Sequence, residues 1–154
     1  MIEIVVYGKP MGKQRPRFSR KTGRAYTPAK TVAFEGRLSL EAQRAMTGRA
    51  LFEGPLRVDI AALMPIAKSW SKKKKLAALA GELPPTSKPD FDNFAKVLDA
   101  LNMVVWTDDA LIVKGQVDKF YSEKPMFAVR VRPIVGLHLP PDWVRKYSDE
   151  GVFA

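Results

Sequence analysis

The sequence predicts one compact domain of the mixed α+β class, with a small, mostly antiparallel sheet and about three helices. Its 154 residues suffice for one domain with a sizeable core, and 46% are hydrophobic, a normal share for a globular protein. Strand-like and helix-like patterns also follow one another without strict β-α-β alternation.

Four segments have the composition of strands. Residues 2–7 are rich in β-branched and aromatic side chains, which predicts a buried strand. Residues 55–64 open with alternating apolar and polar side chains, the period of a strand. Residues 111–119 and 125–133 complete the set, and the short connection between them predicts an antiparallel hairpin. Residues 8–28 are expected to form a loop or an irregular hairpin.

Two helices are predicted from their end signals. Thr27 is expected to cap the first helix, with Pro28 at its first position and an end near Thr47. A second, short helix begins after Ser71, a favoured capping residue, and ends at Gly81.

A third helix follows from an apolar stripe at helical spacing, formed by Phe91, Phe94, Leu98 and Leu101. Asp92, Lys96 and Asp99 lie at positions i, i+4 and i+7 and share a different face. This helix therefore has one side for the core and one for charged groups.

Charge is distributed unevenly along the chain. Its formal net charge is +10, but residues 1–80 carry 17 Lys or Arg against 5 Asp or Glu, whereas residues 81–154 carry 9 against 11. The basic half predicts a polyanionic partner such as DNA or RNA. A solvated, soluble surface is the alternative, since a basic pI alone is weak evidence about partners.

Several function classes are excluded by composition. The chain has no cysteine and one histidine, so disulfides, thiolate zinc sites and His-rich metal sites are not expected. Neither a P-loop nor a dinucleotide-binding glycine motif is present, and no small-molecule cofactor is expected. No apolar run approaches about 18 residues and no signal-peptide pattern opens the chain, so we expect a cytoplasmic protein without a membrane partner.

Two pairs of carboxylates flank the third predicted helix. Asp90 and Asp92 lie at its start, and Asp108 and Asp109 follow its end. Concentrated acid in a basic chain predicts a bound cation, and an oxygen-only donor set favours Mg²⁺ or Mn²⁺ over Zn²⁺. The residues alone leave an alternative open: Asp90 is a helix cap, Asp92 and Lys96 are a surface ion pair, and the later pair is an acidic turn.

The same residues resemble a known family. Residues 90–101, DFDNFAKVLDAL, and 104–112, VVWTDDALI, are similar to the D-x-D-N-x-x-K-x-x-x-D-A-L and W-x-D-D motifs of RusA-type Holliday-junction resolvases. The basic segment 8–31 resembles the start of phage-type members. The likeness covers roughly residues 2–133, which suggests a RusA-like nuclease domain over 1–135 and a tail of unknown role over 136–154.

The resemblance implies a homodimeric, Mg²⁺-dependent endonuclease that nicks four-way DNA junctions symmetrically in recombination and repair, with Mn²⁺ as a substitute. It implies that Asp90, Asp92 and Asp109 bind the metal and that Lys96 is catalytic. Asp99 and Asp108 would have supporting roles, and buried Trp106 would position Asp109.

One position departs from the family pattern: Met103 stands where a small residue such as Gly is expected. If the backbone there has a positive φ, Met103 would be strained. This departure concerns the local turn more than the chemistry.

The basic residues are the predicted DNA contacts, and binding should therefore depend strongly on salt. They are Lys13, Arg15, Arg17, Arg20, Lys21, Arg24, Lys72 and Lys73. For the second run, at 72–75, a solvated helix face is an equal alternative. Phe18 and Tyr26 could stack on DNA, but a core or hairpin position is the favoured interpretation.

Three hypotheses for the function follow. The first is the junction-resolving nuclease. The second is a non-catalytic, basic nucleic-acid-binding protein in which the acids are caps and ion pairs. The third is a metal-dependent nuclease with the same residues that acts on other branched DNA.

Overall fold

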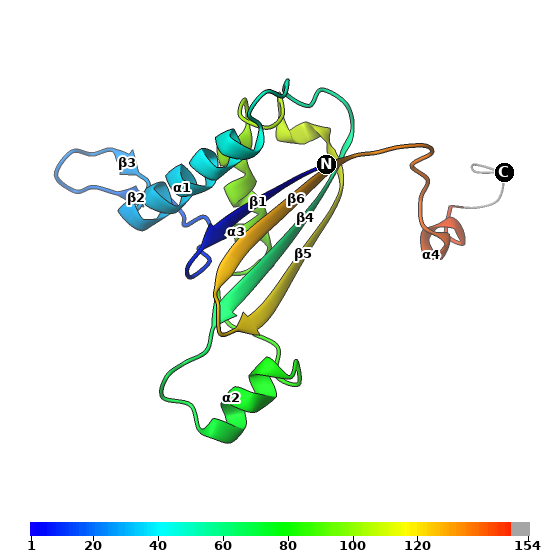
Figure 1. The fold of residues 1–154 in the computed structure, drawn as a ribbon. Coiled ribbons are helices and arrows are strands. Elements are labelled where there is room, and N and C mark those ends of the chain that lie inside the picture. Colours follow the sequence, from blue (N-terminus) through cyan, green and yellow to red (C-terminus); the bar gives the residue numbers. More distant parts are fainter. Residues whose placement is uncertain (149–154) are drawn as a thin grey trace.

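The computed structural model describes residues 1–148 and confirms the mixed α+β class. Its centre is a four-stranded sheet with the order β1-β6-β4-β5 (Figure 1). The strands are β1 (Ile2–Tyr7), β4 (Leu56–Pro65), β5 (Ile112–Ser122) and β6 (Met126–Pro133). β6 runs antiparallel to both of its neighbours, whereas β4 and β5 run parallel.

The predicted hairpin between the last two strands is wrong. β6 does not pair with β5; it inserts between β1 and β4. The cause is burial: Phe127, Val129 and Val131 are at most 1% exposed, which requires a central strand, while most of β5 is accessible at the edge. The connection from Ser122 to Met126 can pass over one strand, because two strand spacings amount to about 10 Å.

One face of the sheet carries the core. Alternating side chains of β1, β4 and β6 point to this face, and helix α1 (Ala29–Ala45) covers it through Phe34, Leu38 and Ala42. The second cover is α3 (Phe91–Lys96), which continues into a 3-10 turn, η1 (Val97–Leu101). The buried residues of the second cover are Phe94, Val97, Leu98 and Leu101.

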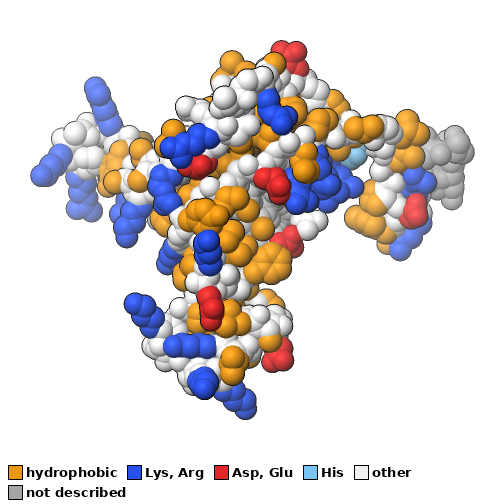
Figure 2. All heavy atoms as spheres, viewed as in Figure 1, with side chains coloured by type: hydrophobic (Ala, Val, Ile, Leu, Met, Phe, Trp, Pro, Cys, Tyr) orange, Lys and Arg blue, Asp and Glu red, His pale blue; other side chains and the backbone are white. Residues whose placement is uncertain are grey.

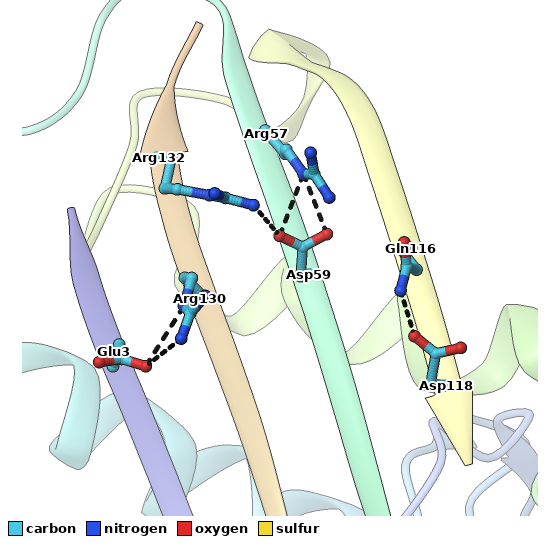
Figure 3. Close-up of polar contacts among 7 residues, drawn as sticks. All are labelled: Glu3, Arg57, Asp59, Gln116, Asp118, Arg130 and Arg132. Carbon is cyan, nitrogen blue, oxygen red and sulfur yellow. Dashed lines mark hydrogen bonds and ion pairs between the residues drawn. The ribbon is translucent and has the colours of Figure 1, made fainter.

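The opposite face of the sheet carries a charged cluster (Figure 3). Asp59 accepts hydrogen bonds from Arg57 at 3.1 Å and from Arg132 at 2.8 Å, and Arg130 pairs with Glu3 at 3.1 Å. Burial raises the pKa of Asp59, but its hydrogen bonds to Arg132 and Arg57 outweigh this and leave the pKa below its ordinary value of 3.8.

Two details of the predicted helices are corrected. Pro28, not Thr27, occupies the N-cap position of α1, and no side chain caps this helix. Phe91 is 62% exposed and does not join the apolar stripe, because it is the first residue of α3 and lies beyond the core. By contrast, Ser71 caps α2 (Lys72–Leu79) as predicted, accepting a hydrogen bond from the Lys74 backbone at 3.2 Å.

Three segments lie outside the four-stranded sheet and its helical cover (Figure 1). The short strands β2 (Arg17–Phe18) and β3 (Ala25–Tyr26) form a hairpin that projects beside α1, and α2 lies beyond the end of the sheet. The chain after β6 leads to a short helix, α4 (Asp142–Arg145); the tail predicted over 136–154 ends outside the described residues. Among the helices of residues 1–148, none is long and apolar enough to cross a membrane.

Candidate active site

A cleft of about 790 Å³ lies between residues 9–17 and residues 88–96. The first segment contributes four cationic side chains, Lys9, Lys13, Arg15 and Arg17. The second contributes the carboxylates of Asp90 and Asp92 together with Lys96. The cleft therefore brings the basic segment and the first acidic pair, which are more than 70 residues apart in sequence, into one site.

Close backbone contact holds the two walls together at Gly12. A Cβ atom at this position would lie 2.7 Å from Cβ of Pro89 and 3.0 Å from Cβ of Asn93. One residue later, the Lys13 backbone N–H donates to the Asn93 carbonyl at 2.8 Å. Only glycine allows the basic segment to approach α3 this closely.

The first acidic pair is available for binding. Asp90 is the N-cap residue of α3, but its side chain makes no capping hydrogen bond, so the capping interpretation fails for the carboxylate itself. Asp92 forms the expected ion pair with Lys96, at 3.3 Å, and both side chains are more than half exposed. Neither carboxylate therefore makes a strong interaction within the fold.

The second acidic group lies at the far end of the helical segment. Asp99, on η1, and Asp109 are close enough to share a hydrogen bond, which raises the pKa of Asp109 to about 6; burial and Asp108 act in the same direction. The Lys13 ammonium lies 3.5 Å from Asp99 and 3.3 Å from Glu35 of α1. Lys13 is therefore paired with two carboxylates in this arrangement, and its predicted contact with DNA stays a prediction.

Asp108 and Trp106 fix the acidic turn. The Asp108 carboxylate accepts a hydrogen bond from the Ala110 backbone at 2.9 Å, the main cause of its lowered pKa, and caps the 3-10 turn η2 (Asp109–Leu111). Trp106 is fully buried, and its Nε1–H donates to Oδ1 of Asn102 at 2.7 Å. The turn that carries Asp109 is thereby anchored in the core.

Met103 has a φ of +63°, so the condition under which strain was expected at this position is met. This left-handed conformation is uncommon for residues other than glycine. The Met103 backbone N–H donates to the Trp106 carbonyl at 2.7 Å, which closes the loop between η1 and the acidic turn.

The two acidic groups remain separate. Within residues 1–148, no three His, Cys, Asp or Glu side chains lie together in a way that could hold a metal ion. Asp90 and Asp92 line the cleft, while Asp109 lies with Asp99 outside its lining. A shared metal site for Asp90, Asp92 and Asp109 stays a prediction.

The remaining predicted DNA contacts lie in three places. Arg15 and Arg17 line the cleft, and Arg20, Lys21 and Arg24 lie on the projecting hairpin. Lys72 and Lys73 are exposed on α2, beyond the end of the sheet. Figure 2 shows Lys and Arg side chains gathered over both projections.

A family of known proteins matches the part of the chain that contains both aspartate motifs. Residues 7–132 match the family described as "Endodeoxyribonuclease RusA". The chain belongs to the RusA family. It is thus an endodeoxyribonuclease of the kind that resolves Holliday junctions, and such nucleases generally depend on a divalent metal.

A relative in Bacillus subtilis (strain 168), "Uncharacterized protein YqaN", is 40% identical over 138 residues. The alignment covers 86% of this chain and 96% of that protein, so the similarity extends over nearly the whole relative.

Two residues of the site were missed from sequence. Glu35 lies four residues after buried Thr31 and three before buried Leu38, so an acid sits on the buried stripe of α1. This position could have identified Glu35 from the sequence, because a half-buried carboxylate needs a positively charged or hydrogen-bonding partner. Gly12 gave no sequence signal, since its importance depends on the approach of Pro89 and Asn93.

Proposed function

We propose that this chain resolves four-way DNA junctions by paired symmetric nicks, as a Mg²⁺-dependent homodimer acting in recombination and repair in the cytoplasm. The cleft carries the proposal: Asp90 and Asp92, which the fold hardly uses, lie beside Lys96 and face a cationic wall. Family membership gives the enzyme class, and the composition of the cleft supports the choice of residues.

The donor set fits a hard divalent cation. It consists of carboxylate oxygens, and Mg²⁺ is usually bound through one or two carboxylates, waters and substrate phosphates. Asp90, Asp92 and Asp109 would hold the ion, with Asp99 and Asp108 in support; Mn²⁺ would substitute. A bound ion of this kind supplies an acidified water and offsets the charge that develops on the phosphate.

Lys96 would bind the scissile phosphate. Its ion pair with Asp92 is solvent-exposed at 3.3 Å, an arrangement worth only a few tenths of a kcal/mol. The ammonium can therefore leave Asp92 for a phosphate oxygen at little cost, where it would stabilise the developing negative charge.

Arg15 and Arg17 would position the DNA backbone. They line the same cleft as the acids, and guanidinium groups bind phosphate oxygens well because their donors are arranged in a fork. Lys13 would act differently: paired with Glu35 and Asp99, it would position the acidic group rather than the DNA.

The homodimer follows from the substrate. Two symmetric nicks on a two-fold junction require two sites related by a two-fold axis. We assign the nuclease domain to residues 1–135, since the family match ends at residue 132, and leave residues 136–154 as a separate tail.

The test is cleavage of a labelled synthetic four-way junction beside a duplex of the same arms, in Mg²⁺ or EDTA. Asp92→Asn is the site variant, and Asp118→Asn, on the opposite face of the sheet, is the matched control. We expect paired nicks on the junction for wild type and the control, lost in EDTA and in Asp92→Asn. Tight junction binding without nicks in Mg²⁺ or Mn²⁺ would favour a non-catalytic binding protein. Cleavage of flaps or forks as efficient as cleavage of the four-way junction would favour a nuclease with a broader substrate range.

A further inference from the structure

The β2–β3 hairpin is held by its own backbone. The Ser19 N–H donates to the Arg24 carbonyl and the Gly23 N–H donates to the Ser19 carbonyl, both at 2.9 Å. Gly23 has a φ of +67°, which closes the turn. The hairpin projects from the body beside α1 (Figure 1), so it can reach a partner without any rearrangement of the core.

The hairpin is cationic and not neutralised by the protein. No acidic residue occurs between Glu3 and Glu35. Within residues 1–148, none of its four cations, Arg17, Arg20, Lys21 and Arg24, forms an ion pair. A polyanion is the partner that this charge selects.

Two aromatic rings of the hairpin are exposed to solvent. Phe18 is 68% exposed and Tyr26 is 48% exposed, so the core interpretation of these residues is wrong, although both lie in a hairpin. In the strand register, Phe18 lies opposite Ala25 and Arg17 lies opposite Tyr26. Because paired residues project from the same face and successive residues alternate, the Phe18 ring lies on the face opposite to Tyr26, with only the methyl group of Ala25 beside it.

Exposed aromatic rings among cations are the features that bind unstacked bases. The ring provides a stacking surface for a base, and the cations bind the phosphates on either side of it. A duplex offers no free base face, since its bases are stacked, whereas a branch point has bases that can be unstacked at lower cost. Such a surface therefore distinguishes branched DNA from duplex.

The hairpin also starts at the active-site cleft. Arg15 and Arg17 line the cleft with Asp90 and Asp92, and Phe18 is the next residue. DNA bound in the cleft would therefore lie beside the hairpin that carries the Phe18 ring. One continuous segment therefore contributes both to the active-site cleft and to the hairpin.

We propose that Phe18 stacks on bases at the branch point of the DNA, so that the β2–β3 hairpin selects branched DNA over duplex. This inference rests on the proposed nuclease function and names the feature of the substrate that the enzyme recognises. The cations of the hairpin supply affinity for both kinds of DNA, and the ring supplies the preference.

The test compares binding of a four-way junction and a duplex in EDTA, where no cleavage occurs, with 2-aminopurine at the branch point. Phe18→Ala should weaken junction binding by roughly 5- to 100-fold, the usual effect of removing a stacking aromatic, and duplex binding by less than about 2-fold. It should also abolish the change in 2-aminopurine emission, while Phe18→Trp should retain both.

Phe120→Ala is the matched control, because Phe120 is 50% exposed but lies on β5, facing the other side of the sheet. It should bind both DNAs as wild type does. If Phe18→Ala keeps the junction preference and the emission change, or weakens both DNAs equally, the inference is overturned while wild-type cleavage still supports the nuclease. If wild type cuts no DNA in Mg²⁺ or Mn²⁺, the proposed nuclease fails, and the comparison in EDTA still decides the role of Phe18.

Discussion

Gly12 offers a sharp test of how the cleft is built. In Gly12→Ala, the new Cβ would lie 2.7 Å from Cβ of Pro89 and 3.0 Å from Cβ of Asn93. Ordinary carbon–carbon contacts are about 3.5–4.0 Å, so the two walls must separate by roughly 1 Å. Neither Cβ can swing aside, because both are attached directly to the backbone of the opposite wall.

Two losses follow from that separation. The hydrogen bond from the Lys13 N–H to the Asn93 carbonyl, now 2.8 Å, would stretch beyond its useful range. Overpacking of this kind typically costs about 1–3 kcal/mol of the free energy of unfolding. A displacement of about 1 Å in an active site can also reduce the rate by up to roughly 100-fold.

Urea unfolding and the initial rate of junction cleavage measure the two effects. Gly36→Ala is the control: Gly36 lies inside α1, and its added Cβ meets no atom within 4 Å. We expect this control to gain about 0.5–1 kcal/mol from helix propensity with an unchanged rate. A Gly12→Ala protein with the midpoint and rate of wild type would refute the proposed contact between the two walls.

Three further predictions concern other parts of the chain. Because the pKa of Asp59 is lowered in the folded state, the carboxylate contributes its full stabilisation above about pH 4 and loses it as the pH falls through the folded pKa. The urea midpoint of Asp59→Asn should therefore depend less on pH below about 4 than that of wild type. Parallel plots of midpoint against pH for the two proteins would contradict this. Met103→Gly should raise the free energy of unfolding by about 0.5 kcal/mol, since relief of the left-handed strain exceeds the entropy cost of glycine; a lower urea midpoint would contradict it. Replacing Lys72 and Lys73 by Gln should reduce the slope of log K against log salt for junction binding by about 1–2; an unchanged slope would assign them to a solvated face.

Local patterns in the sequence predicted the elements but not all of their neighbours. Alternation identified β4, and Ser71 marked the start of α2, because these signals act between residues close in the chain. The order of the strands depends on which of them must be buried on both sides. Nothing in the short connection from β5 to β6 revealed that it passes over β4.

In the candidate site, too, local motifs were predicted from the sequence but contacts between distant segments were not. The D-x-D and D-D motifs located the carboxylates, and the positive φ of Met103 followed from the departure at one position. The contacts of Lys13 with Glu35 and Asp99 join three segments far apart in sequence, so the charge of Lys13 alone could not reveal them. Exposure of Phe18 was equally hidden, because an aromatic residue beside a turn suits both a core and a surface.

Paired nicking by a dimer can be measured most directly on a supercoiled plasmid that extrudes a four-way junction from an inverted repeat. Two nicks made within the lifetime of one complex linearise the plasmid, whereas isolated nicks give open circles. The account predicts linear product from wild type in Mg²⁺ and none from Asp92→Asn. Open circles alone would contradict paired symmetric nicking, and uncut plasmid in both Mg²⁺ and Mn²⁺ would contradict the nuclease itself.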